Sequence, residues 1–114
     1  MVVNYEAVWK VLAELVTELR KAGEGLPPSI MNDLRSAKTT IQILRVDKDN
    51  PYHVSRIEEF LGNVELYVMR AAQKKFGTEA ADGWLRRLGQ ARAENHKKVR
   101  EETRFIPGIP RDRH

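Results

Sequence analysis

The sequence of 114 residues contains no cysteine, which excludes disulfides and thiolate metal sites. No apolar run approaches the roughly twenty residues that a membrane-spanning helix needs. The start, MVVNYEAVWKVLAEL, also lacks the basic flank and unbroken apolar core of a signal peptide. We therefore expect a cytoplasmic protein that is not embedded in a membrane.

The sequence also lacks the alternation of apolar and polar residues that is typical of strands, and it has no internal repeat or low-complexity segment. Its length is that of one domain. Hydrophobic residues make up 41% and charged residues 32% of the chain, a composition typical of a highly charged globular protein. The chain is long enough to form a core without metals or crosslinks.

Apolar residues recur at spacings of three and four in four segments, which predicts helices with one buried face. The connections between them are short, so neighbouring helices should be antiparallel. We predict an all-α, up-and-down bundle of four helices, with long third and fourth helices. The bundle domain should span 1–103 and be followed by a proline-containing tail at 104–114. The predicted helices cover about 4–22, 28–46, 51–76 and 78–102.

Residues that favour helix ends occur at these boundaries. Asn4 is a predicted cap of the first helix, and Gly23 suits the left-handed position beyond its end. Asn50 is expected to cap the third helix, Gly77 to stop it, and Thr78 to cap the fourth.

The fourth helix has an uneven supply of apolar residues. Ala81, Leu85 and Leu88 are predicted to face the core, but few apolar residues follow them. The second half of this helix should therefore project into solvent or lie on a partner.

Positive charge is concentrated in the last quarter of the chain. Residues 1–83 hold 11 Lys and Arg against 12 Asp and Glu, whereas residues 84–114 hold 9 against 4. Such a gradient bears on the choice of partner. We interpret the basic residues of the fourth helix as a solvated surface, since glutamates interrupt them and few rings are available for stacking on bases. An RNA- or DNA-binding surface is the alternative. The candidate nucleic-acid residues are Arg86, Arg87, Arg92, Lys97, Lys98, Arg100 and Arg104.

Residues with the spacing of a catalytic or metal site are not evident. No two histidines stand at the spacing that places two metal ligands on one helix face, and no serine lies in a glycine elbow. We predict no catalytic residue, no metal and no cofactor. A magnesium-dependent nucleotide hydrolase is a less favoured alternative, because it needs acidic residues from two facing helices. It requires the convergence of Glu14, Glu18, Glu58 and Glu59.

The segment RSAKTTIQ places hydroxyl side chains in mid-helix, where they compete with backbone hydrogen bonds. One interpretation is close helix packing at small residues. The alternative is a polar groove that holds an anion, with Ser36 and Thr40 on its floor and Arg35 and Lys38 beside it.

A set of aromatic residues, Tyr5, Trp9, Phe60 and Tyr67, lies slightly off the main apolar stripes. These side chains either widen the core or form an apolar patch for a dimer or protein partner.

The segments LPPSIMNDLRSAKTTIQ, RIEEFLGNVELYV and FIPGIPRDRH resemble a family of uncharacterised archaeal proteins, a domain of unknown function. The resemblance covers nearly the whole chain. It implies an archaeal, cytoplasmic, helical protein with no assigned activity, catalytic residue or cofactor. The last of these segments contains Phe105, Ile106 and Ile109, and we expect it either to fold back on the bundle or to begin a further segment.

We therefore expect a non-enzymatic interaction and oligomerisation module that forms a homo-oligomer or binds a protein partner. RNA or DNA binding through the basic fourth helix and tail is the alternative.

Overall fold

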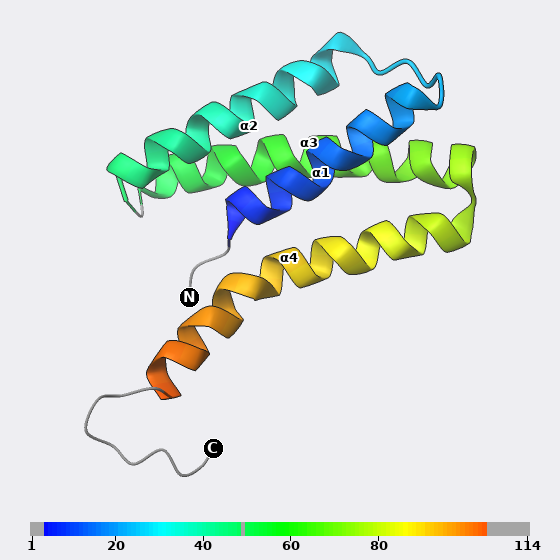
Figure 1. Cartoon of the computed structure of the whole chain (residues 1–114). Helices are drawn as coiled ribbons and strands as arrows, with labels where there is room; N and C mark the ends of the chain where they lie inside the picture. Colours follow the sequence, from blue (N-terminus) through cyan, green and yellow to red (C-terminus); the bar gives the residue numbers. More distant parts are fainter. Residues whose placement is uncertain (1–3, 49, 105–114) are drawn as a thin grey trace.

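The computed structural model describes residues 4–48 and 50–104, with side chains as far as residue 93. Four helices follow one another with short connections (Figure 1). This confirms the predicted all-α bundle of four helices, and the described residues contain no strand. The helices are α1 (Tyr5–Lys21), α2 (Pro28–Val46), α3 (Pro51–Phe76) and α4 (Thr78–Arg104).

Two helices form the centre of the bundle. α1 and α3 contact each other, and each of them also contacts both α2 and α4. Within the described residues α2 and α4 do not touch. The central pair therefore has α2 on one side and α4 on the other. Of the four seams that α2 and α4 form with this pair, α2–α3 and α1–α4 share no helix.

The ends of the first three helices form at the residues that the sequence indicates. Asn4 caps α1, since its side-chain oxygen accepts a 3.1 Å hydrogen bond from the Ala7 backbone. After α1, Gly23 has a φ of +87°. The N–H groups of Gly23 and Glu24 donate to carbonyls in the last turn of α1, which completes a Schellman motif. Asn50 caps α3 by accepting from the Tyr52 N–H at 2.9 Å.

At the junction of α3 and α4 one prediction needs correction. The N–H of Ala81 donates to the carbonyl of Gly77, and this is the first backbone bond of α4. Gly77, with a φ of +99°, thus both ends α3 and occupies the cap position of α4. Thr78 is the first residue of the helix and not its cap.

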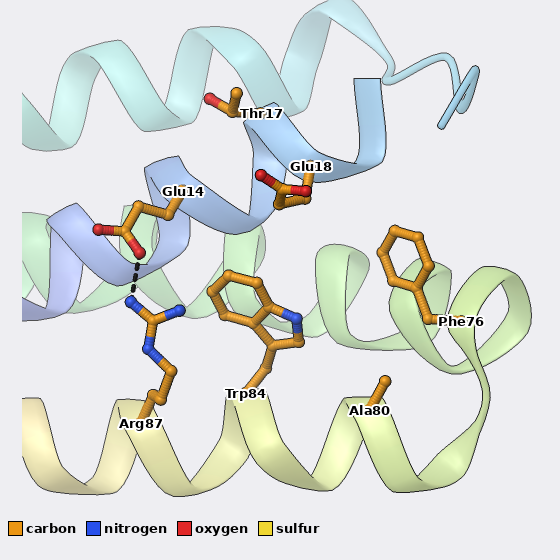
Figure 2. A pocket seen from close by; sticks show the side chains of 7 residues that line it. All are labelled: Glu14, Thr17, Glu18, Phe76, Ala80, Trp84 and Arg87. Atoms are coloured by element: carbon orange, nitrogen blue, oxygen red, sulfur yellow. Dashed lines mark hydrogen bonds and ion pairs between the residues drawn. The ribbon is translucent and has the colours of Figure 1, made fainter. Parts of the chain in front are cut away.

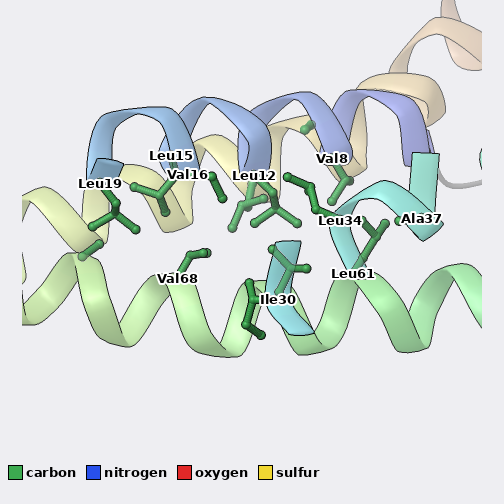
Figure 3. Close-up of a cluster of buried hydrophobic side chains, with 14 of the residues drawn as sticks. Val8, Leu12, Leu15, Val16, Leu19, Ile30, Leu34, Ala37, Leu61 and Val68 are labelled. Atoms are coloured by element: carbon green, nitrogen blue, oxygen red, sulfur yellow. The ribbon is translucent and has the colours of Figure 1, made fainter. Parts of the chain in front are cut away.

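The core runs along the inner faces of all four helices (Figure 3). It consists of apolar side chains only; among the described residues no polar or charged residue is buried. Of the residues predicted to face the core from α4, Ala81 and Leu88 are confirmed as buried. The buried residues are Val8, Leu12, Leu15, Val16, Leu19, Ile30, Leu34, Ala37, Ile41, Ile57, Leu61, Val64, Val68, Ala71, Ala72, Ala81, Leu88 and Ala91.

Leu85 is an exception, because 47% of it is exposed, whereas Leu88 is 1% exposed. The inner face of α4 is formed instead by Ala81, Trp84, Leu88 and Ala91, whose spacings are three, four and three. Leu85 is rotated about 100° from Trp84 around the helix. The prediction that Leu85 faces the core is therefore wrong.

The C-terminal end of α4, orange in Figure 1, diverges from the other three helices. Its backbone is helical through Arg104. Arg104, the first residue of the expected tail, is thus still part of α4, and the rest of that tail, including Phe105, Ile106 and Ile109, lies outside the described residues.

Candidate functional site

The outer seam between α1 and α4 is a groove with two hollows, of about 610 and 620 Å³, which share Arg87. The hollow nearer the α3–α4 junction contains two aromatic side chains, Phe76 and Trp84 (Figure 2). The other hollow has a smaller apolar lining, from Ala7, Val11 and Ala91. We refer to the two hollows together as the α1–α4 groove.

An ion pair crosses the middle of the α1–α4 groove. The Arg87 guanidinium donates a hydrogen bond to Glu14 Oε1 on the facing helix (Figure 2). The guanidinium also lies over the Trp84 ring, 4.5 Å from its centre, where a cation interacts favourably with the π face. Arg87 therefore joins the two helices and divides the groove.

The charges on the α1 side of the groove follow a regular order. Lys10, Glu14 and Glu18 are spaced by four residues, so they lie on one face of α1 about one turn apart. Lys10 lines one hollow, and Glu14 and Glu18 line the other. Glu14 is already paired with Arg87, so the groove has a basic end at Lys10 and an acidic end at Glu18. The Glu18 carboxylate also lies 3.8 Å from the exposed Lys21 ammonium on the same helix.

The four glutamates of the hydrolase hypothesis do not converge. Glu14 and Glu18 line the α1–α4 groove. Glu58 accepts a 2.8 Å hydrogen bond from the Tyr5 hydroxyl, and Glu59 lies 3.4 Å from Arg56 on its own helix. In residues 4–48 and 50–93, no three side chains of the metal-ligating types gather into a possible ion site.

The basic residues of α4 have different surroundings. Arg86 is exposed, Arg87 is paired with Glu14, and Arg92 donates a 2.6 Å hydrogen bond to Glu65 on α3. Two of these three cations thus bind carboxylates of their own chain. The side chains of Lys97, Lys98, Arg100 and Arg104 lie outside the described residues.

The predicted aromatic set does not lie on a single face. All four side chains are partly buried and pack against the core. Trp9 donates to the Leu34 carbonyl of α2, whereas Tyr5 donates to Glu58 of α3. The aromatic rings of the α1–α4 groove, Phe76 and Trp84, were not in that set. The inward position of Trp84 could have been predicted from its helical spacing with Ala81, Leu88 and Ala91.

The polar groove predicted in α2 is present at the α2–α3 seam, where Arg35, Ser36 and Thr40 line a hollow of about 600 Å³. Lys38 is not part of it, because its ammonium lies over the Trp9 ring, 5.1 Å from the ring centre. Side chains of α3, among them His53 and Arg56, form the opposite wall. The spacing of residues within α2 could not predict His53 and Arg56, because they belong to a different helix.

Among the described residues, no helix combines the length and the apolar character needed to cross a membrane.

Comparison with known proteins agrees with this fold. A family model described as the DUF2096 N-terminal four-helical bundle domain matches residues 5–99. No curated protein and no solved structure matches the chain. The archaeal origin that the sequence resemblance implies stays a prediction. The family match covers all of the helical core, and the chain therefore belongs to the family of the DUF2096 N-terminal four-helical bundle domain, a domain of unknown function.

Proposed function

We propose that this domain is a non-enzymatic self-association module, in which two copies pack against each other through the α1–α4 groove. The observation that carries the proposal is the placement of Lys10 and Glu18 at opposite ends of the groove. The eight residues between them correspond to about 12 Å along the helix.

A twofold dimer brings the same surface of both copies together, so each contact occurs twice in reversed order. If two α1–α4 grooves face each other with their α1 helices antiparallel, Lys10 of each copy lies near Glu18 of the other. The two Glu14 side chains then lie near the twofold axis. Each of them is already paired with Arg87 of its own copy, which reduces their mutual repulsion. The charge pattern of the groove is thus complementary to itself.

The apolar lining supports the same interface. Trp84 and Phe76 border the acidic end of the groove, and Phe76 is 38% exposed. Tryptophan and other large side chains in desolvated pockets supply most of the binding energy in protein interfaces. Charged residues at the margin fix the orientation of the partner and its selectivity. The α1–α4 groove has both elements.

We expect the protein to act in the cytoplasm, because its sequence has no cysteine and therefore does not need an oxidising compartment to form disulfides.

Light scattering coupled to size exclusion tests the proposal. The monomer mass is 13.1 kDa, and we expect a concentration-dependent rise toward twice that mass. Lys10→Glu and Glu18→Lys each place two like-charged pairs across the interface. Each single variant should therefore weaken dimerisation about tenfold at low salt, at roughly 0.5–1 kcal/mol per pair. The double variant restores opposite charges and should recover the affinity.

Asp82→Lys is the matched control, since it makes the same change of charge as Glu18→Lys at an exposed position of α4 that does not line the groove. It should leave the dimer unchanged. A particle that stays monomeric at millimolar concentration would overturn the proposal. The proposed contact between Lys10 and Glu18 would be contradicted if the double variant dimerised more weakly than both single variants.

A further inference from the structure

The α2–α3 seam lies on the opposite side of the central helices from α4, and it contains a hollow of about 600 Å³. We call it the α2–α3 groove. Its lining combines cationic, hydroxyl and aromatic side chains. Among the described residues the lining includes no aspartate or glutamate, although Asp47 Oδ2 lies 3.3 Å from the lining residue His53. The residues on which the argument depends are Arg35, Ser36, Thr39 and Ile43 of α2 and Tyr52 and Arg56 of α3.

The two arginines come from the two walls of the groove. Arg35 lies on α2 and donates to Asn32 Oδ1, one turn earlier. Arg56 lies on α3, with its guanidinium 4.6 Å from the centre of the Phe60 ring and 3.4 Å from Glu59 Oε1. Stacking on a ring fixes the plane of a guanidinium and leaves its edge donors available. Each guanidinium has five N–H donors, so both retain donors for an anion.

Hydroxyl groups line the α2 wall of the groove, on the same helix as Arg35. Ser36, Thr39 and Thr40 lie within little more than one turn of α2. The Thr40 hydroxyl donates its proton to the Ser36 carbonyl at 2.8 Å, so Ser36 and Thr39 supply the hydroxyl donors for an anion. Hydroxyls beside two guanidinium groups form a donor set that suits a phosphate group.

The other end of the groove is apolar and aromatic. Tyr52 is 65% exposed and Ile43 is 43% exposed, although both are large apolar side chains in the groove lining. The Tyr52 ring is held edge-on against His53, with the ring centres 5.6 Å apart. An exposed ring held in this way offers a face on which a planar group can stack.

We propose that the α2–α3 groove binds a small phosphorylated molecule of the nucleoside monophosphate class. Arg35, Arg56 and the hydroxyls of Ser36 and Thr39 bind the phosphate, and Tyr52 and Ile43 contact the planar portion. This site is independent of the self-association face, because α2 does not take part in the α1–α4 groove.

Titrations followed by ¹⁵N–¹H NMR test the proposal with three probes: inorganic phosphate, adenosine and adenosine monophosphate. Adenosine monophosphate should shift the amide signals of residues that line the α2–α3 groove. Phosphate should shift the same signals with at least tenfold lower affinity, and adenosine should bind weakest, because it lacks the anion.

Arg56→Ala should lower the affinity for adenosine monophosphate at least tenfold. Arg70→Ala is the matched control, since it removes an exposed arginine from the same helix about 20 Å away; it should change the affinity less than twofold. Arg56→Lys keeps the charge but loses the fork of donors, and it should fall between the wild type and Arg56→Ala. Circular dichroism of each variant confirms that the helices are intact.

Three outcomes would overturn the proposal. The first is no shift at the groove with millimolar adenosine monophosphate. The second is equal affinity for adenosine and its monophosphate, since the cationic wall would then have no role. The third is an equal loss of affinity for adenosine monophosphate in Arg70→Ala and Arg56→Ala. This result would show that binding depends only on the net charge of the protein.

Discussion

The indole Nε1 of Trp9 donates a 2.8 Å hydrogen bond to the backbone carbonyl of Leu34, and this contact joins α1 to the middle of α2. The ring itself packs against the core, and the Lys38 ammonium covers its outer side. Trp9 thus packs as a hydrophobic residue while its one polar atom is satisfied by the neighbouring helix.

Trp9→Phe should lower the free energy of unfolding by about 1–2 kcal/mol. The change removes the hydrogen bond, worth about 0.5–1.5 kcal/mol, together with part of the buried ring area. Urea denaturation followed by circular dichroism measures the difference without relying on tryptophan fluorescence. An unchanged free energy would show that the Trp9–Leu34 bond does not contribute to the α1–α2 contact.

Tyr5 is expected to make stability depend on pH at the alkaline end. Partial burial, the hydrogen bond to Glu58 and the charge of that carboxylate raise the pKa of Tyr5 from 10.0 to about 12, against an opposing effect of Arg92. The folded state therefore favours the protonated phenol. This contribution to stability is fully present below pH 10 and is lost as the pH rises through about 12.

Comparison of the wild type with Tyr5→Phe by urea denaturation tests this expectation. The variant should be less stable by about 0.5–1.5 kcal/mol near neutral pH, and the difference should shrink between about pH 10 and 12. Glu58→Gln removes the carboxylate charge, so an absorbance titration should place the pKa of Tyr5 nearer its ordinary value. A stability difference that is constant throughout this range would contradict the assignment.

The two leucines of α4 provide a test of the packing. Leu88→Ala should cost about 2–5 kcal/mol of the free energy of unfolding, because it leaves a cavity in the core. Leu85→Ala should cost less than about 1 kcal/mol, since the side chain is 47% exposed. Thermal and urea denaturation of both variants gives the ratio directly. Similar losses for the two would mean that Leu85 packs inside, as its spacing in the sequence suggests.

Much of the fold could be predicted because its determinants are local. The caps at Asn4 and Asn50 and the left-handed glycines at Gly23 and Gly77 act within one or two turns of the chain. The stripes of α1 and α3 are long, and an error at one position does not change which face is buried. Both helices therefore appear close to their predicted bounds.

The α4 stripe shows where such reasoning is insufficient. Leu85 and Trp84 are neighbours, and either continues a helical stripe from Ala81 to Leu88. The packing surface of α1 and α3 decides between them, and it favours the larger ring. The pairs Arg87–Glu14 and Arg92–Glu65 link residues of different helices, 73 and 27 positions apart in sequence, so no local spacing predicts them.

The sequence by itself determined four amphipathic helices, their ends and their membership of one bundle, because these depend on periodicity and on side chains that act within a turn. Only the tertiary structure decided which surfaces meet at the two seams. It brought Arg35 and Arg56 into the lining of one groove and Glu14 and Trp84 into the lining of the other, and it placed the Lys38 ammonium over the Trp9 ring. The physical reason is that a groove between helices depends on their relative rotation and register, which follow from the packing of the whole core.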